Sequence, residues 1–408
     1  MADTENNKNS NSPALRFPGF YEPWQRMAVA DLLEFYSTNS LSWEQLSNDA
    51  ESEFKNLHYG LIHVGLPTIV NIGKDALPYI KGDAIPRNYV LCENGDVSFA
   101  DASEDISEVA KVIEFTGIGN EKVVSGLHTI HGRDRQKKTI VGFKGYLFSS
   151  EAFHKQTRRI AQGSKVFSVS PRNFSEIFVS IPSKEEQRKI AELLLLLDER
   201  IATQRRLIED LEKLKSSIID RCYSGNNNLK LSEFISQVSQ RNRSNHPYKV
   251  LSVSNVRGFV LQSEQFADRE IASENTASYK IVTKDVFAYN PARINIGSIA
   301  RFKGYDKGIV SPMYVCFKVE GELQPKYLEY FFQTRRFKND VALRLEGSVR
   351  LCLSFEALCE IEIPILSPTE QIAISSAIET LCNKIVVEQK VLSNMDKQRK
   401  YLLSKLFI

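Results

Sequence analysis

Two stretches of the chain, about half its length apart, carry the same pattern of apolar residues with the same two polar interruptions. Steps of four and three residues alternate in both, a spacing that keeps one stripe of a helix facing a partner helix in a coiled coil. The first stripe is Ile190, Leu194, Leu197, Ile201, Gln204, Ile208, Leu211, Lys215, Ile218 and Cys222, and the second is Ile374, Ile378, Leu381, Ile385, Glu388, Leu392, Met395, Arg399, Leu402 and Leu406. Because the fifth and eighth positions are polar in both copies, we infer an internal duplication in which each half ends in a long helix.

The polar interruptions allow two interpretations. In an antiparallel helix pair, Lys215 could lie beside Glu388 and Gln204 beside Arg399, and these polar pairs would fix the register of the helices at some cost in stability. Alternatively, all four side chains point outward at places where the two helices separate.

Composition places the chain among ordinary globular proteins. Of its 408 residues, 42% are apolar and 25% are charged, and no apolar run approaches the roughly 20 residues of a membrane span. No signal-peptide core follows the polar start, so we expect a cytoplasmic protein. The six cysteines show no CxxC spacing, which favours free thiols over disulfides or metal ligands. The net charge of +3 gives only a weak indication of nucleic-acid binding.

The residue pattern outside the two long helices is typical of mixed α/β domains. Short apolar runs bounded by Gly and Pro, such as residues 61–65, 111–115 and 139–143, predict strands. Helices are predicted after Trp24 and over residues 151–161, and Ser183 with Glu186 predicts a capping box at the start of the first long helix. The expected layout is a disordered tail (1–14), a globular domain (15–182), a helix (183–223), a second globular domain (224–364) and a final helix (365–408).

Shorter segments repeat in the same order in both halves, as expected of a duplication. We match the following pairs: Gly95-Asp96-Val97 with Lys284-Asp285-Val286, Gly163-Ser164 with Gly347-Ser348, Ile181-Pro182 with Ile363-Pro364, and Glu186-Gln187 with Glu370-Gln371.

With these motifs the chain resembles a known family, the DNA-specificity subunit of Type I restriction-modification enzymes. The resemblance covers nearly the whole chain and rests on short motifs whose order is repeated. They are the opening segment 15–24, the segments 95–106, 161–164 and 346–348, and the two helix junctions 181–191 and 363–373.

The resemblance implies two target-recognition domains separated by two long antiparallel helices, related by a pseudo-twofold axis. Each domain would read one half of a bipartite DNA target, and the helix pair would set the gap. It also implies a non-catalytic chain whose partners are double-stranded DNA, two modification subunits and two restriction (motor) subunits. S-adenosylmethionine, ATP and Mg would then be bound by the partner subunits, with no cofactor in this chain.

DNA contact requires cations for phosphates and planar hydrogen-bonding groups for base edges. A basic segment between two apolar runs in the first half reads as an exposed loop, and a segment with Arg and Asn follows a strand in the second half. For any one of these residues a solvated surface role is the alternative. The DNA-binding candidates are Arg133, Arg135, Lys137, Lys138, Lys165, Arg172, Arg293, Asn295, Arg301, Lys303 and Arg350.

Signatures of catalysis are missing from the sequence. Tyr289-Asn290-Pro291-Ala292 only partly matches the Asn-Pro-Pro-Tyr loop of adenine methyltransferases, and its counterpart in the first half is Phe99-Ala100-Asp101-Ala102. No GxxxxGK[ST] or HExxH motif is present, so neither a nucleotide site nor a metal site is predicted. Two other functions stay open at this point: a methyltransferase or nuclease with unrecognised motifs, and a coiled-coil scaffold without a DNA role.

Overall fold

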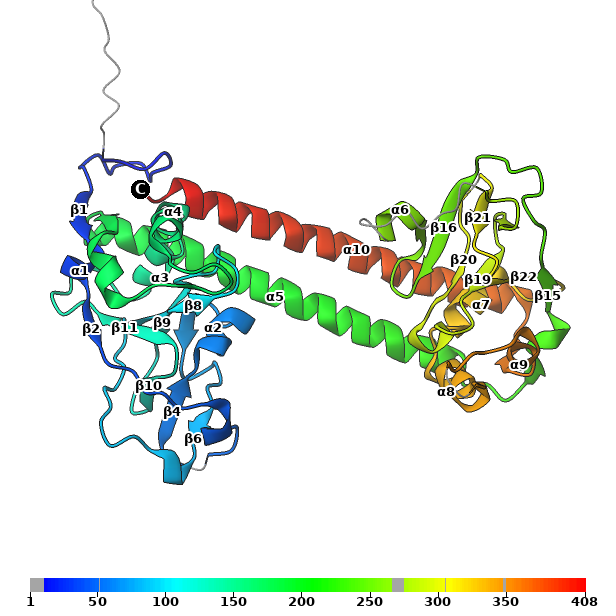
Figure 1. Cartoon of the computed structure of the whole chain (residues 1–408), viewed down its shortest axis with the longest axis horizontal. Coiled ribbons are helices and arrows are strands. Elements are labelled where there is room, and N and C mark those ends of the chain that lie inside the picture. Colours follow the sequence, from blue (N-terminus) through cyan, green and yellow to red (C-terminus); the bar gives the residue numbers. More distant parts are fainter. Residues whose placement is uncertain (1–10, 51, 266–274, 305, 348–349) are drawn as a thin grey trace, which may run out of the picture. The chain divides into compact units, whose positions relative to one another are not determined.

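The computed structural model describes residues 11–50, 52–265, 275–304, 306–347 and 350–408. The chain divides into two compact units, residues 1–205 with 391–408 and residues 206–390. Two long helices, α5 (Lys184–Cys222) and α10 (Pro368–Lys405), contribute to both units (Figure 1). The mixed α/β class and the two long helices confirm the predicted fold class. In the described part of the chain, no helix is both long and apolar enough to cross a membrane.

The first unit contains two main sheets. A five-stranded sheet has the order β2-β11-β7-β9-β5, a four-stranded sheet has the order β10-β4-β6-β3, and two-stranded pairs β1–β13 and β12–β8 complete the unit. The strands are β1 (Gln25–Ala28), β2 (Glu34–Tyr36), β3 (Leu46–Ser47), β4 (Phe54–Leu57), β5 (Ile69–Asn71), β6 (Tyr79–Ile80), β7 (Val97–Ala100), β8 (Ala102–Ser103), β9 (Val112–Thr116), β10 (Lys122–Ser125), β11 (Thr129–Arg133), β12 (Phe167–Ser168) and β13 (Phe178–Ile181). Its short helices are α1 (Val29–Leu32), α2 (Tyr59–Val64), α3 (Lys144–Phe148), α4 (Glu151–Ile160) and the 3-10 helices η1 (Trp43–Gln45), η2 (Gly82–Ala84) and η3 (Pro171–Ser175).

The main core of the first unit joins the five-stranded sheet to both long helices. Buried aromatic rings from β7, α3 and α4 pack in one cluster with apolar residues from the start of α5 and the end of α10. Within this unit the two helices run antiparallel, because Asp198 contacts Arg399 while Arg205 contacts Asp396. In this unit the apolar stripe of each long helix therefore faces the other helix and the domain core, as the heptad spacing predicts.

The second unit repeats this plan. Its sheets have the orders β15-β22-β19-β20 and β17-β16-β21-β18, beside the pair β14–β23. The strands are β14 (Asn228–Lys230), β15 (Ile235–Val238), β16 (Lys249–Ser254), β17 (Gly258–Leu261), β18 (Lys280–Val282), β19 (Phe287–Tyr289), β20 (Ile299–Arg301), β21 (Gly308–Val310), β22 (Val315–Val319) and β23 (Glu362–Pro364). The helices are α6 (Gln262–Gln265), α7 (Pro325–Phe331), α8 (Arg335–Arg344), α9 (Phe355–Cys359), η4 (Leu231–Glu233) and η5 (Ile294–Ile296).

In the second unit, the end of α5 and the start of α10 pack on the domain core through Ile219, Tyr223 and Ile378. The amide of Gln389 on α10 donates to Glu212 on α5 at 3.4 Å. Each unit thus contains one antiparallel segment of the helix pair.

The duplication is visible in topology and in hydrogen bonds. β4 pairs in parallel with β10 in the first unit, and β16 pairs in parallel with β21 in the second. Ser150 caps α4 and Thr334 caps α8, each accepting a backbone N–H three residues later. Thr334 follows Ser150 by 184 residues, the same separation that relates Gln371 to Gln187.

Two of the proposed sequence matches are shifted in the structure. The N–H of Gly95 donates to Phe115 and that of Asp285 donates to Phe302, so Gly95 corresponds to Asp285 and not to the residue before it. Both have a positive φ, +90° and +67°. At the helix junction, the second copy of Ile-Pro lies two residues further from the helix than the first.

Three local predictions for the first unit were wrong. The helix expected after Trp24 is only the four-residue α1, which follows strand β1. Residues 61–65 form the end of helix α2, which His58 caps through its side chain and Gly65 ends with φ +131°. The 139–143 segment forms no strand because side chains occupy its backbone donors: Ile140 N–H donates to Gln187 and Gly142 N–H donates to Glu114.

The capping box at the start of α5 is only half formed. Ser183 accepts the N–H of Glu186 at 3.4 Å, but the carboxylate of Glu186 binds Arg16 at 2.8 and 2.9 Å. In the second copy the box is complete, since Ser367 and Glu370 each accept the other's backbone N–H. The first long helix therefore exchanges one cap bond for a contact with the N-terminal segment.

Candidate DNA-contact loops

Each unit contains one tight loop at the matched Gly-Ser motif. In the Gly163 loop (residues 162–168), Gln162 and Ser168 exchange two backbone hydrogen bonds of 3.0 and 2.8 Å. In the Gly347 loop (residues 346–352), Glu346 and Cys352 do the same at 3.0 and 2.8 Å. The two loops therefore have the same length and the same closure.

Glycine is required in both loops. Gly163 has φ +124° and Gly347 has φ +127°, a region that L residues rarely adopt. A Cβ would lie 1.9 Å from the carbonyl oxygen of Val166 in the first loop and 2.3 Å from that of Arg350 in the second. The Gly-Ser motif is thus explained by backbone geometry for its glycine, while Ser348 lies outside the described residues.

Both loops present a cation beside an exposed apolar residue. Lys165 is exposed, and its neighbour Val166 is 52% exposed. Arg350 is exposed, and its neighbour Leu351 is also 52% exposed. Among the described residues, neither Lys165 nor Arg350 forms an ion pair, so both charges are available to an anionic partner.

A second loop is held next to each of these. Val169 N–H donates to the carbonyl of Asp101 after β7, and Leu353 N–H donates to that of Pro291 after β19. This pair of equivalent bonds confirms the predicted correspondence of residues 99–102 with 289–292. In the second unit the adjoining loop carries Arg293, which is exposed and, within the described part, has no carboxylate partner.

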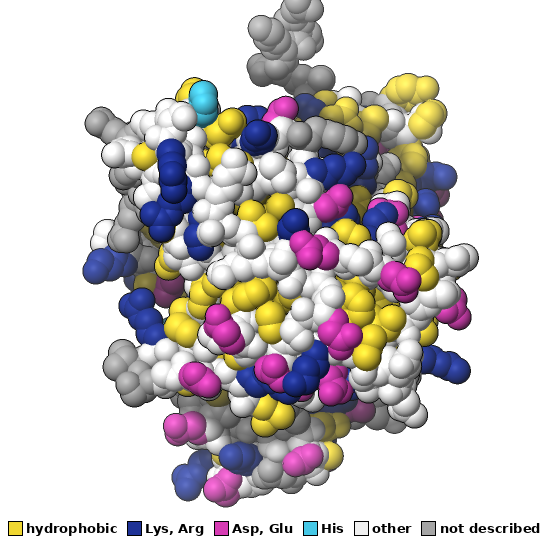
Figure 2. All heavy atoms as spheres, turned by 90° about the vertical axis from the view of Figure 1, so that its right-hand side faces the viewer, with side chains coloured by type: hydrophobic (Ala, Val, Ile, Leu, Met, Phe, Trp, Pro, Cys, Tyr) yellow, Lys and Arg dark blue, Asp and Glu magenta, His cyan; other side chains and the backbone are white. Residues whose placement is uncertain are grey.

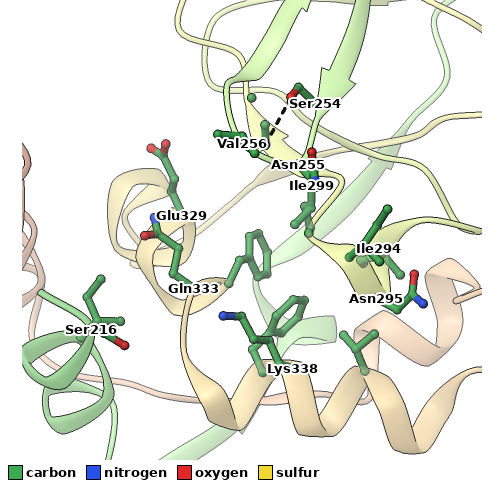
Figure 3. A pocket seen from close by; sticks show the side chains of 18 of the residues that line it. Ser216, Ser254, Asn255, Val256, Ile294, Asn295, Ile299, Glu329, Gln333 and Lys338 are labelled. Carbon is green, nitrogen blue, oxygen red and sulfur yellow. Dashed lines mark hydrogen bonds between the residues drawn. The ribbon is translucent and has the colours of Figure 1, made fainter. Parts of the chain in front are cut away.

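Asn295 lies at the edge of a cavity of about 880 Å³ in the second unit. In Figure 3 its amide and the hydroxyl of Ser216 on α5 lie on opposite sides, with Lys338 of α8 between them. Asn255 follows β16 and also lines the cavity. The cavity is lined by apolar side chains together with amides, hydroxyls, lysines and the carboxylates of Glu212 and Glu329.

Arg133, one of the predicted DNA contacts, makes several hydrogen bonds within its own domain. Its guanidinium donates to both oxygens of Asp96, at 2.9 and 2.7 Å, and to the carbonyl of Leu91 at 2.8 Å. Burial opposes ionisation of Asp96, but hydrogen bonds from His131 and Arg133 outweigh it and lower the pKa of this carboxyl. These bonds hold the Arg133 guanidinium in place within its own domain, and its role in DNA contact stays a prediction.

The same pocket brings Cys92, Asp96 and His131 within 4.8 Å of one another, a separation that metal ligands could have. Asp96 already accepts from His131 Nε2 at 2.7 Å and from Arg133. Burial raises the pKa of the Cys92 thiol to about 12. A neutral thiol next to a guanidinium is a poor cation site, so we interpret this cluster as a buried polar network.

Arg301 also has partners within its own unit. It donates to Asp285 at 2.6 Å and to Glu329 at 2.8 Å, and Lys303 binds the second oxygen of Glu329 at 2.7 Å. These four groups neutralise one another on the surface of the second unit, so the predicted role of Arg301 and Lys303 in DNA contact has no support in their surroundings.

The remaining DNA-binding candidates differ in whether their charged groups already have partners within the unit. Arg135 binds Glu34 and donates to the hydroxyl of Tyr36, and Lys138 donates to a backbone carbonyl at 3.4 Å. Lys137, with φ +50°, and Arg172, in η3, are exposed. Neither forms an ion pair within the described residues, so these two stay plausible contacts.

One polar seam residue, Arg399, contacts both the other long helix and the globular part of the first unit. Arg399 of α10 donates to Asp198 of α5 at 2.5 and 3.1 Å and to the hydroxyl of Thr68 at 2.8 Å. Burial opposes its charge, but Asp198 more than compensates and raises the pKa of Arg399. Its equivalent, Lys215, lines the cavity in the second unit.

The predicted register pairs are not needed to explain these contacts. The described hydrogen bonds of Arg399 go to Asp198 and Thr68, and Glu388 forms an ion pair with Lys384 on its own helix. Gln204 is buried at the seam. Pairing of Lys215 with Glu388 and of Gln204 with Arg399 stays a prediction.

Charge on the surface is mixed. Figure 2 shows one face of the second unit, on which Lys and Arg side chains are interspersed with acidic and apolar ones. The net charge of the whole chain is only +3, which gives little non-specific attraction to DNA.

Comparisons with known proteins agree with this geometry. Residues 21–213 match the family model of the Type I restriction modification DNA specificity domain. The fold is similar to the S subunit of a Type-I restriction-modification system from M. genitalium, with 16% identity, 97% of this chain and 99% of that chain covered, and a TM-score of 0.56. It is also similar to the HsdS subunit from Thermoanaerobacter tengcongensis, with 14% identity, 98% and 99% coverage and a TM-score of 0.50.

A third similar structure is described as the structural basis of complex assembly and conformational transition of the type I R-M system. It shares 13% identity, covers 95% of this chain and 98% of that chain, and has a TM-score of 0.57. No curated protein sequence matches the chain significantly.

Residues 21–213 are thus similar to the DNA specificity domain of Type I restriction-modification systems. The chain as a whole shares the fold of the solved S subunits of Type I restriction-modification systems.

Proposed function

We propose that the chain recognises a bipartite DNA target, with residues 15–182 reading one half-site and residues 224–364 reading the other. The observation that carries this proposal is the pair of equivalent loops, each closed by the same backbone bonds and each presenting a cation beside an exposed apolar residue. Cations that contact phosphates fix the position of a protein on DNA, and neighbouring side chains can then read base edges.

We further propose that the two long helices set the gap between the half-sites. α5 has 39 residues and α10 has 38, and at about 1.5 Å per residue each is nearly 60 Å long. Successive turns of B-DNA lie about 34–36 Å apart. A helix pair of this length spans one to two turns, so its length would correspond to a fixed number of unread base pairs.

The proposed partners are those of Type I restriction-modification specificity subunits: two modification subunits and two restriction subunits. Exposed apolar side chains on the long helices, Leu195 and Leu196 on α5 and Val386 and Val387 on α10, offer surfaces for such partners. S-adenosylmethionine, ATP and Mg would be bound by those subunits. Because the substrate is DNA, we place the assembled complex in the cytoplasm.

Selection of bound duplexes from a randomised pool tests the proposal. The full-length chain, assembled with its modification subunits, is expected to enrich two short motifs at one fixed spacing. Substituting both Lys165 and Arg172 by Ala should weaken binding, and substituting Arg293 and Arg350 by Ala should do the same through the other half-site. Enrichment of a single continuous motif, or of none, would contradict bipartite recognition.

A further inference from the structure

A glutamine is fully buried at the junction between the first recognition domain and its long helix. Gln187 lies in the first turn of α5 and is 0% exposed. Its Oε1 accepts the N–H of Ile140 at 2.9 Å, and its Nε2 donates to the carbonyls of Lys138 at 3.1 Å and Pro182 at 3.0 Å. The Gln187 amide thus connects a loop of the domain, the residue that follows β13 and the first turn of α5.

The second junction contains the same arrangement. Gln371, in the first turn of α10, is also 0% exposed. Its Oε1 accepts the N–H of Gln324 at 2.8 Å, and its Nε2 donates to the carbonyls of Glu322 at 3.4 Å and Leu366 at 2.8 Å. Every partner follows its counterpart in the first junction by 184 residues, as Gln371 follows Gln187.

The partner atoms all belong to the backbone, while the partner side chains differ between the copies. Lys138 corresponds to Glu322, and Pro182 corresponds to Leu366. We call each buried glutamine with its three backbone hydrogen bonds a glutamine clamp. The clamp does not depend on which side chains the bonded residues of the domain carry. Two domains with different surfaces can be attached to their helices in the same way.

Geometry makes such a clamp different from apolar packing at the same place. Apolar contacts are non-directional and tolerate small rotations, whereas a hydrogen bond weakens steeply as its angle departs from linearity. Rotation or tilt of a domain about its helix start would strain all three bonds at once. Leaving a buried donor or acceptor without a partner is costly, which penalises any such movement further.

We propose that Gln187 and Gln371 are positioning residues that fix the setting of each recognition domain on its helix, and thereby the gap that the chain accepts between half-sites. This inference rests on the proposed bipartite recognition. The two amides determine where each DNA-contact loop lies relative to the helix, without touching DNA themselves.

The test uses the full-length chain assembled with its modification subunits and a series of duplexes with both half-sites intact. The gap in these duplexes is the preferred length, one base pair shorter or one base pair longer. For Gln187→Met and Gln371→Met, we expect the ratio of affinities for the preferred and altered gaps to fall at least about fivefold. The preferred bases within each half-site should not change.

The control is Gln398→Met, at an exposed position on α10, which should keep the wild-type ratio. Gln187→Glu and Gln371→Glu serve as second variants, because they keep the length and the acceptor but lose the donor. Lower affinity with an unchanged gap ratio in all four clamp variants would assign the glutamines a merely structural role and overturn the inference. A wild-type complex without any gap preference would instead contradict the bipartite function.

Discussion

Replacing Arg399 by Met should destabilise the first unit far more than the equivalent change, Lys215→Met, destabilises the second. Arg399 binds both oxygens of Asp198 and the hydroxyl of Thr68, in a site where the Arg399 side chain is 25% exposed and that of Asp198 is 19% exposed. Lys215 lines an open cavity and, among the described residues, forms no ion pair.

The size of the effect follows from this partial burial. Breaking a buried ion pair on one side costs about 3–5 kcal/mol, and an exposed pair contributes under about 1 kcal/mol. We therefore expect Arg399→Met to cost about 2 kcal/mol, because Asp198 keeps only the Tyr146 hydroxyl as a described side-chain donor, at 3.2 Å. Lys215→Met should cost less than about 0.5 kcal/mol.

Thermal unfolding of the purified chain measures both variants. For a unit of this size, 2 kcal/mol corresponds to a fall in Tm of about 4–8 °C. Adding Asp198→Asn to Arg399→Met should recover about half of the loss, since the uncompensated carboxylate is removed. Equal shifts for Arg399→Met and Lys215→Met, or no recovery in the double variant, would refute the interpretation that this seam position holds the domain through Asp198.

Three further outcomes are expected. Gly163→Ala and Gly347→Ala should each weaken binding to target duplex at least about tenfold, measured by titration, because the added Cβ overlaps a carbonyl in the loop; wild-type affinity in either variant would contradict the assigned loop geometry. Lys165→Ala and Arg350→Ala should each lower the slope of log affinity against log salt by about one, the signature of one lost phosphate contact; an unchanged slope would place that cation away from DNA. Asp96→Asn should reduce stability at pH 7, measured by denaturant unfolding. Because the folded-state pKa of Asp96 lies below its ordinary 3.8, its stabilisation is present above that value and lost as the pH falls through the lowered one. The variant should therefore lose less stability than wild type on acidification below about pH 4, and an identical pH profile would contradict the role of Asp96.

Much of the architecture could be predicted because its signals are local. A heptad stripe such as Ile190 to Cys222 reports helix and partner face within a few residues, and the matched polar positions reported the duplication. The order of short motifs then indicated the family whose model residues 21–213 match. These features depend on spacing along the chain and need no knowledge of long-range contacts.

The sequence could not predict contacts whose partners come from distant parts of the chain. Arg133 reads as a loop cation until folding brings Asp96, 37 residues earlier, against it. Arg301 similarly meets Glu329, 28 residues later. The strand predicted over 139–143 was lost because Gln187 and a buried glutamate accept its N–H groups.

One missed signal was present in the sequence. Asp198 is an acidic residue directly after an apolar run on the same helix, and it faces the seam where Arg399 breaks the second stripe. An acidic and a basic interruption in two paired stripes indicate an ion pair, but their relative register could be obtained only from the structure. The sequence also placed Gln187 and Gln371 at matched positions, but nothing in it indicated that their side chains are buried.

Insertion of one heptad into α5 and one into α10 tests the central claim most directly, with the recognised sequence mapped by sequencing methylated DNA from cells that express the assembled system. Seven residues lengthen a helix by about 10 Å, the rise of about three base pairs. The account predicts a longer gap between two unchanged half-sites. Altered half-sites at the original spacing would contradict it.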